Sequence, residues 1–375
     1  MYVDKMYFPL TKVLSAALPA LLFFACSSVE ISHNTAPLPR HHLPNGHFEN
    51  TDDSCPPIRD TMEADSLVPK FRTRMYRLPI VRGNEELWQD STASSAAWIG
   101  HSTYYILWRG YGILTDPMFS TYSSPIQLIG PKRGTPPGRS LDSLPNVNLV
   151  IVSHDHYDHL DRTSIVKIFN RWNNVKFAVP LKVAAILESW GIPSKNIIEL
   201  DWWESAVAGP LKLTFVPAHH TSRRGIFASS AKSTLWGGWI LERPTEDSLH
   251  TTKIWFGGDL AMGDGSYYKK IAERFAPIDV SFLPIGSYKP SRYTRVHASP
   301  RQAAQLHLLT KSKLSLAMHW GTFGFVYDRL EDPPKDLARA RKELGIPDTA
   351  FYVPKHGEIV PLFTLRKHAR SERKD

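Results

Sequence analysis

Short β-rich runs alternate with amphipathic helical patterns through most of the chain beyond residue 75. Thr103–Trp108 and Tyr111–Asp116 are largely apolar runs joined by Arg109-Gly110, so they predict a β-hairpin. Because strands and helices are interleaved, the pattern predicts sheets covered by helices. Further strands are expected at 147–152, 175–179, 211–216, 234–241, 253–256, 280–283 and 314–317, and helices at 162–172, 182–190, 268–275, 300–309 and 334–344.

The first 25 residues have the pattern of an export signal. Lys5 and Lys12 precede an apolar run of 13 residues from Val13 to Ala25. Such a run is too short to span a bilayer comfortably, so we expect the signal to be cleaved.

The end of this signal is similar to a bacterial lipoprotein cleavage site. In Phe23-Phe24-Ala25-Cys26, Cys26 is the residue that would be acylated as the first of the mature chain, although Phe23 stands where an aliphatic residue is usual. The alternative is an ordinary secretory signal with a Cys26–Cys55 disulfide, since these are the only two cysteines. The expected location is the bacterial cell envelope, with the chain anchored to a membrane.

The segment that follows the signal is rich in Pro, Asn, His, Ser and Asp and lacks apolar periodicity. It predicts a tether and a poorly structured arm. Its histidines, His33, His41, His42 and His47, lack the spacing of a fixed site, so we expect them to be solvated, although a His-rich arm could also collect adventitious metal. The chain is therefore divided into a signal at 1–25, this arm at 26–70, one folded domain at 71–362 and a basic tail at 363–375.

The formal net charge of +9 favours anionic partners. Lipid headgroups, phosphoesters and nucleic acid all satisfy this condition. Nucleic acid is disfavoured because an exported chain is removed from most of it.

The run from His154 to His159 carries the most specific chemical signal. Its pattern, His-x-His-x-Asp-His, is expected by chance in roughly one in a thousand chains of this length and here directly follows the predicted strand at 147–152. At a tight turn, alternate residues point the same way, so His154 and His156 can reach one ion while Asp158 and His159 turn toward a second. Neutral imidazoles and carboxylates suit zinc, although iron and manganese accept the same ligands.

Three later strands also end on residues that can bind a metal. His219-His220 follows the strand at 211–216, Asp259 follows Phe256-Gly257-Gly258, and His319 follows Ala317-Met318. A side chain at a strand end is held rigidly at the rim of a packed sheet. These residues are therefore candidates to complete the metal site.

Together these motifs resemble the metallo-β-lactamase superfamily, and within it the N-acylphosphatidylethanolamine phospholipase D-like branch. The resemblance spans residues 71–358 and implies an αββα sandwich of two mixed β-sheets flanked by helices, with the metals in a cleft at one edge of the sheets. The matching strings include Trp98–Thr103, Ile113–Pro117, Gly130–Arg133, Ser153–Leu160, Val216–Gly225, Leu235–Trp239, Leu283–Tyr288, His297–Pro300 and His319–Phe323.

The resemblance implies a site for two zinc ions. One ion would be held by three histidines, the second by a carboxylate and two histidines, with Asp259 bridging. His220 is preferred over His219 because the family string places its ligand two residues before the serine, here Ser222. The implied ligand sets are His154, His156 and His220 for the first ion, and Asp158, His159 and His319 for the second.

Three further residues receive supporting roles. Asp116 resembles a carboxylate that orients a ligand imidazole, a role such sites usually require, and His101 is also expected to support the metal ligands. His297 resembles a residue on the substrate side, near the scissile phosphate. The alternative for His297 is a cap for the helix that begins near Pro300.

The expected reaction is hydrolysis of a phosphodiester by a hydroxide that bridges the two ions. Asp158 is the expected proton acceptor, and Lys132 or Arg133 is a candidate to meet the phosphate, although the basic pair also fits a solvated turn. The leading substrate is N-acylphosphatidylethanolamine or a related phospholipid at a membrane surface.

Two segments depart from the family pattern near the substrate. Leu260-Ala261-Met262 stands where the family usually has Thr-Gly-Tyr after the aspartate, and Arg292–Arg295 replaces an aromatic-rich segment. The substrate is therefore less firmly implied than the metals.

Two alternatives to a lipid hydrolase stay open. The first is a hydrolase of a soluble lactone or sugar phosphate, and the second is a non-catalytic surface lipoprotein. A lipid substrate predicts an entrance lined by aromatic side chains, whereas core packing is their alternative role. The candidates are Trp98, Trp108, Trp202 and Trp203.

Overall fold

The computed structural model describes residues 38–52, 77–225, 230–326 and 328–363. The described residues from Arg40 to Phe363 form one compact unit. Within the described ranges, no helix is both long enough and apolar enough to span a bilayer. The predicted export signal, Cys26, Cys55 and tail residues 364–375 lie outside the described residues.

The first sheet contains seven strands in the order β14-β1-β2-β3-β4-β5-β6. Pairing is antiparallel from β14 to β3 and parallel from β3 to β6. The strand bounds are β1 (Ser94–Gly100), β2 (Thr103–Trp108), β3 (Tyr111–Thr115), β4 (Leu149–Ile151), β5 (Lys176–Pro180), β6 (Ile197–Leu200) and β14 (Ile359–Pro361).

The second sheet repeats this arrangement with seven strands in the order β13-β12-β11-β10-β9-β8-β7. Pairing is antiparallel from β7 to β10 and parallel from β10 to β13. The bounds are β7 (Ser205–Ala208), β8 (Leu211–Val216), β9 (Gly238–Pro244), β10 (Thr251–Phe256), β11 (Val280–Pro284), β12 (Leu314–Met318) and β13 (Phe351–Tyr352).

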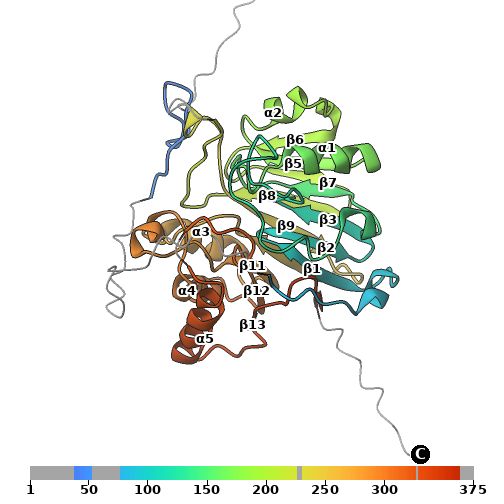
Figure 1. Cartoon of the computed structure of the whole chain (residues 1–375), viewed down its shortest axis with the longest axis vertical. Helices are drawn as coiled ribbons and strands as arrows, with labels where there is room; N and C mark the ends of the chain where they lie inside the picture. Colours follow the sequence, from blue (N-terminus) through green and yellow to red (C-terminus); the bar gives the residue numbers. More distant parts are fainter. Residues whose placement is uncertain (1–37, 53–76, 226–229, 327, 364–375) are drawn as a thin grey trace, which may run out of the picture. The chain divides into compact units, whose positions relative to one another are not determined.

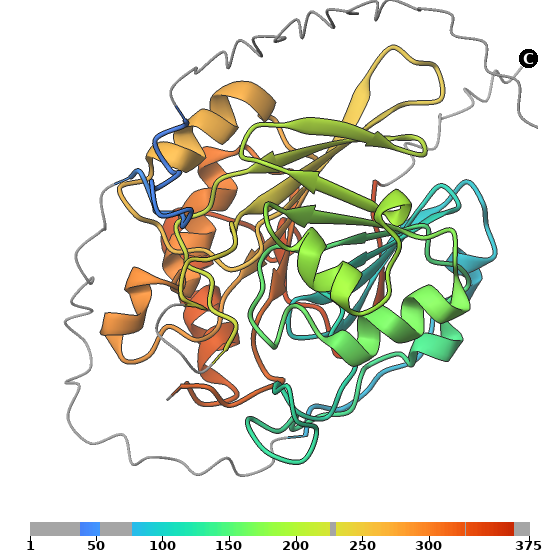
Figure 2. The same cartoon turned by 90° about the horizontal axis from the view of Figure 1, so that it is seen from above.

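Helices cover the outer face of each sheet (Figures 1 and 2). One apolar cluster joins the first sheet to α1 (Arg162–Arg171) and α2 (Ala184–Ser189). Another joins the second sheet to α3 (Ser266–Phe275), α4 (Pro300–Leu309) and α5 (Asp332–Leu344). Single 3₁₀ turns occur at η1 (Glu85–Trp88), η2 (Leu141–Ser143), η3 (Ser194–Asn196) and η5 (Ser291–Arg295).

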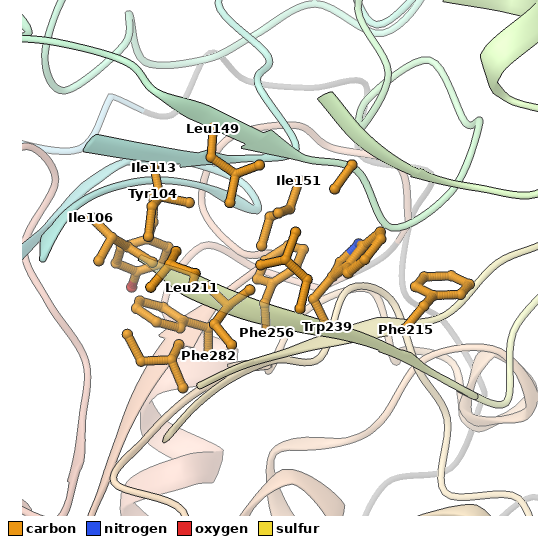
Figure 3. Close-up of a cluster of buried hydrophobic side chains, with 14 of the residues drawn as sticks. Tyr104, Ile106, Ile113, Leu149, Ile151, Leu211, Phe215, Trp239, Phe256 and Phe282 are labelled. Atoms are coloured by element: carbon orange, nitrogen blue, oxygen red, sulfur yellow. The ribbon is translucent and has the colours of Figure 1, made fainter. Parts of the chain in front are cut away.

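The two sheets face each other across a third apolar cluster (Figure 3). Tyr104, Ile113 and Leu149 come from the first sheet, and Phe256 and Phe282 come from the second. Both faces of each sheet are therefore covered, which explains why β2 and β11 consist wholly of buried residues. The predicted fold class, an αββα sandwich of two mixed sheets, is confirmed.

Most predicted elements are present, with shifts at their ends. The hairpin forms as β2 and β3, and α4 has the predicted bounds. The strand expected at 234–241 begins only at Gly238, as β9, because residues 234–237 form a loop whose Gly237 N–H donates to the Ser153 carbonyl of the other layer. The short edge strands β6, β7, β13 and β14 were not predicted, and neither was β1.

Part of the predicted arm is folded onto the domain. The N-terminal segment, defined here as residues 40–52, belongs to the compact unit that starts at Arg40. Phe48 is buried in the core between the sheets, and His41 is buried as well. The expectation that His41 and His42 are solvated is therefore wrong, because both imidazoles contact the carboxylate of Asp201.

Candidate metal centre

The residues that can bind a metal lie on turns that directly follow strands of both sheets. Asp116 follows β3, the run from His154 follows β4, and His220 follows β8. Asp259 follows β10 and His319 follows β12. Because these strands end at one rim of the sandwich, their side chains converge from both layers.

Three histidines make the first group. His154, His156 and His220 offer nitrogen atoms that all lie within 4.8 Å of one another. Ser153 Oγ lies 2.8 Å from His154 Nδ1, and the Val296 carbonyl accepts a hydrogen bond from His220 Nδ1 over 2.7 Å. Burial lowers the pKa of all three imidazoles, which keeps them in the neutral form that a metal requires.

A second group combines histidines with a carboxylate. His101, Asp158, His159 and His319 offer ligand atoms within the same 4.8 Å limit. His101 Nε2 lies 2.7 Å from Asp158 Oδ2. Burial raises the pKa of Asp158, but the neighbouring imidazoles outweigh it and hold that pKa well below its usual range. Asp158 therefore offers a charged oxygen to a metal ion.

Asp259 stands between the two groups. Its Oδ2 atom lies 3.7 Å from His220 Nε2 in the first group. The same atom lies 3.2 Å from His159 Nε2 and 3.0 Å from His319 Nε2 in the second. A carboxylate in this position can contact two ions at once, as the sequence prediction required.

Buried polar atoms without hydrogen-bond partners show that the site fits metal ions. Among the described residues, these atoms include Nε2 of His159, His220 and His319, and Oδ1 of Asp259. A buried polar group without a partner is costly. A metal ion would satisfy several of these atoms together, so the donor set fits two divalent cations.

The carboxylates around His159 favour a positive charge at this position. Burial alone would lower its pKa, but Asp259, Asp158 and Asp116 outweigh burial and raise the pKa well above its usual value. The same negative field that favours a proton on the imidazole also favours a metal ion at Nε2. His159 Nδ1 is already engaged, 2.7 Å from Asp116 Oδ2.

Three residues at the centre adopt backbone conformations that residues other than glycine seldom adopt. The φ angles of His101, Asp116 and His319 are 54°, 33° and 62°. Such conformations persist where the surroundings hold them, and they occur often at functional sites. Gly258 lets the turn before Asp259 approach Ser153 closely, since a Cβ atom at residue 258 would lie only 2.5 Å from the Cβ of Ser153.

His297 lies at the centre and does not cap a helix. Its Nδ1 atom lies 3.7 Å from Asp259 Oδ2, whereas Ser299 caps α4 by accepting from Gln302 N. The side chain of His297 is 16% exposed, against 2% for Asp259 and 1% for His319. His297 is therefore the most accessible of the three, and it also forms a group of possible metal ligands with His220 and Asp259.

Other candidates of the sequence analysis lie elsewhere. His219 Nδ1 lies 2.7 Å from Asp52 Oδ1, so this imidazole is held by a structural contact. Arg133 is buried and its guanidinium donates to the carbonyls of Met118 and Ser120, whereas Lys132 lies over the Tyr122 ring. The tryptophans proposed for an entrance are core residues: Trp98, Trp108 and Trp202 are buried, and Trp203 packs on the same core.

Several contacts at the centre were not anticipated. The Val296 carbonyl is a backbone group, so no residue type could have revealed its bond to His220. Thr322 Oγ1 accepts from the His101 amide over 2.6 Å. Ser153 donates hydrogen bonds to the Asp116 carboxylate from both its amide and its hydroxyl. These bonds can be predicted only once the strands that precede Ser153 and Asp116 are known to be neighbours.

Asp116→Asn is expected to weaken metal binding by about 10- to 100-fold, because the carboxylate orients His159 and increases its basicity. The measurement is zinc affinity by competition with a chromophoric chelator. Thr121→Ala, on an exposed position of the following loop, is the control and should retain wild-type affinity. Equal affinity in Asp116→Asn and wild type would remove Asp116 from this role.

The comparisons with known proteins agree with this geometry. A family described as the beta-lactamase superfamily domain matches residues 111–320. An uncharacterized protein of Mycobacterium tuberculosis is 34% identical over 307 residues, covering 80% of this chain and 78% of that protein. The N-acyl-phosphatidylethanolamine-hydrolyzing phospholipase D 1 of Caenorhabditis elegans is 32% identical over 294 residues, covering 75% and 80%.

Solved structures share the fold at lower identity. A metallo hydrolase from the archaeon Ignicoccus hospitalis aligns with a TM-score of 0.53 and 22% identity, covering 73% of this chain and 100% of that one. A diiron beta-hydroxylase from Streptomyces venezuelae aligns with a TM-score of 0.53 and 18% identity, covering 72% and 54%. These likenesses establish the fold and leave the metal open.

Proposed function

Because the chain belongs to the metallo-β-lactamase superfamily and is a metal-dependent hydrolase, we propose that it cleaves N-acylphosphatidylethanolamine or a related phospholipid as a zinc-dependent phospholipase D. The observation that carries the proposal is the pair of ligand groups joined by Asp259. The similarity to the enzyme of Caenorhabditis elegans supports the lipid substrate.

The residues of the centre take distinct roles in this proposal. His154, His156 and His220 would hold one ion, Asp158, His159 and His319 would hold the other, and Asp259 would contact both. When bound, two divalent cations lower the pKa of water between them and neutralise charge on the phosphoryl oxygens.

The side chains around the reacting phosphate then manage protons. Asp158 accepts a proton from the attacking water, and His101 Nε2, 2.7 Å away, stabilises that carboxylate. The phosphorus–oxygen bond to the head group breaks, and the leaving oxygen takes up the proton released by Asp158, giving phosphatidic acid and an N-acylethanolamine. Burial lowers the pKa of His297 to about 4, so its imidazole is neutral and can donate one hydrogen bond to a phosphate oxygen.

Aromatic side chains line one side of the centre, although not those predicted. The Phe323 and Phe325 rings stack with centroids 5.3 Å apart, and their centroids lie 5.3 and 5.7 Å from that of His101. Both are only partly buried. An apolar wall beside the metal ligands suits an acyl chain better than a sugar phosphate.

A loop with exposed aliphatic side chains ends next to this wall. Ile126, Leu128 and Ile129 are 53%, 81% and 62% exposed. Arg133, at the end of the loop, lies over the Phe323 ring. No acidic residue occurs between Asp116 and Asp142, and Lys132 in this loop is exposed. We propose that the loop contacts an anionic phospholipid surface.

Leu128→Ser/Ile129→Ser is expected to reduce hydrolysis of lipid in vesicles by about tenfold, because partial burial of these two aliphatic side chains in the membrane contributes about 1.4 kcal/mol to membrane contact. Hydrolysis of a short-chain, monomeric phosphodiester should stay unchanged. The exposed residue Leu249, 77% exposed in the turn between β9 and β10, provides the control Leu249→Ser. An equal loss on both substrates would contradict the membrane contact.

The proposal includes export and acylation of Cys26, which place the chain at a membrane. The mass of the mature N-terminus tests this, and a retained leader would contradict it. The substrate is tested by zinc-loaded protein on a panel of phospholipids, lactones and sugar phosphates. Turnover of a soluble substrate without release of phosphatidic acid from any lipid would favour a hydrolase of soluble substrates. Absence of turnover on every substrate would favour the non-catalytic lipoprotein.

A further inference from the structure

A second set of ligand-type residues lies outside the centre, where the N-terminal segment meets the residue after β6. His41 Nε2 lies 2.6 Å from Asp201 Oδ1, and His42 Nε2 lies 2.7 Å from Asp201 Oδ2. All three ligand atoms lie within 4.8 Å of one another. None of these residues belongs to either group of the centre.

The packing around the cluster fixes both imidazoles. The His41 ring stacks on Trp202 with centroids 4.3 Å apart, and the His42 ring meets Phe48 edge to face at 5.1 Å. The side chains of His41 and Asp201 are 8% and 14% exposed. Since the rings are already held in place, little rotamer entropy remains to be lost when a ligand binds.

The donor set suits a transition metal. Two imidazole nitrogens and one carboxylate occur as the protein ligands of zinc, with water as the fourth ligand. Although burial raises the pKa of Asp201, the hydrogen bonds from His41 and His42 outweigh it and lower that pKa. Asp201 is therefore charged. The same contacts would be present if hydrogen bonds alone joined the three side chains. A measurement of metal binding distinguishes a metal site from such a hydrogen-bonded cluster.

We propose that His41, His42 and Asp201 form a third metal site, separate from the centre, that binds a divalent transition-metal ion and fastens the N-terminal segment to the domain. The site is structural and does not depend on the substrate of the enzyme. Zinc is the ion favoured by two imidazoles and a carboxylate.

The site would also support the centre through the same segment. Asn50 donates a hydrogen bond from Nδ2 to the carbonyl of His220 over 2.8 Å. Asp52 Oδ1 lies 2.7 Å from Nδ1 of the adjacent His219. Fastening residues 41 and 42 therefore helps to hold the far end of the N-terminal segment against the turn that carries a metal ligand.

The test compares the zinc content of three full-length proteins dialysed against the same buffered free zinc concentration. Wild type and His47→Ala are expected to hold one more ion per chain than His41→Ala/His42→Ala. His47 is the matched control because it lies in the same segment and its Nδ1 contacts the Ala231 carbonyl, outside the cluster. Equal zinc content in all three proteins would overturn the proposal.

His41→Asn/His42→Asn guards against a folding defect, because asparagine retains a hydrogen-bond donor toward Asp201 but is a poor zinc ligand. This variant should lose the same ion and melt like wild type in the presence of a chelator. Retention of the ion in the asparagine variant would also overturn the site. Asp201→Asn should behave like the asparagine variant in both measurements.

Discussion

In the Asp259→Ala variant, hydrolysis is expected to fall about a thousandfold or more, equivalent to about 4 kcal/mol of lost transition-state stabilisation. The centre should retain at most one metal ion. The physical reason is the position of the carboxylate, whose Oδ2 lies within 3.7 Å of His220 and within 3.2 Å of His159 and His319. Steady-state kinetics and elemental analysis of the same preparation check this result.

The controls separate charge from shape. Asp259→Asn keeps the volume of the side chain and removes its charge, so it should lose metal nearly as fully as the alanine variant. Asp142→Asn removes a carboxylate whose side chain is 90% exposed and contacts Arg171 at the surface, and it should behave like wild type. Full metal content together with full activity in Asp259→Ala would contradict the bridging role.

His297→Ala is expected to lower kcat/KM about a hundredfold while the metal content stays at the wild-type value. His297 is more accessible than Asp259 and His319 and donates to the phosphate in our proposal, so its loss affects the transition state and spares the metal ligands. The fall should appear mainly in kcat. Kinetics and elemental analysis on one preparation provide both readouts.

His297→Gln provides the second arm of this test. Glutamine retains a hydrogen-bond donor and should recover part of the lost rate. If His297→Ala loses metal as well as activity, the residue is a ligand, and the assignment to the substrate side is wrong.

The sequence revealed much of the site because its chemistry depends on strand ends. The run from His154 to His159 identifies two candidate ligands in each group of the centre by spacing alone. Apolar strands predict that His220, Asp259 and His319 follow strand ends, where the structure finds them. Alternation of strands and amphipathic helices likewise predicted sheets covered by helices, whereas the sandwich of two sheets was implied by the resemblance to the superfamily.

The parts that were missed depend on contacts between distant segments. Residues 40–52 lack periodicity because they form no regular helix or strand, yet Phe48 enters the core and Asn50 reaches the backbone of His220. Short edge strands such as β14 carry too few residues to show alternation. Phe323 and Phe325 reach His101 only through the turn after His319, which no local pattern specifies.

The central claim is that water cleaves the phosphodiester of a phospholipid at a metal centre built on Asp259. It is tested most directly with zinc-loaded protein and N-acylphosphatidylethanolamine vesicles in ¹⁸O-labelled water, analysed by mass spectrometry of both products. The account predicts phosphatidic acid that carries one ¹⁸O atom in its phosphate, and about a thousandfold less of this product from Asp259→Ala. Absence of phosphatidic acid, or label only in the N-acylethanolamine, would contradict it.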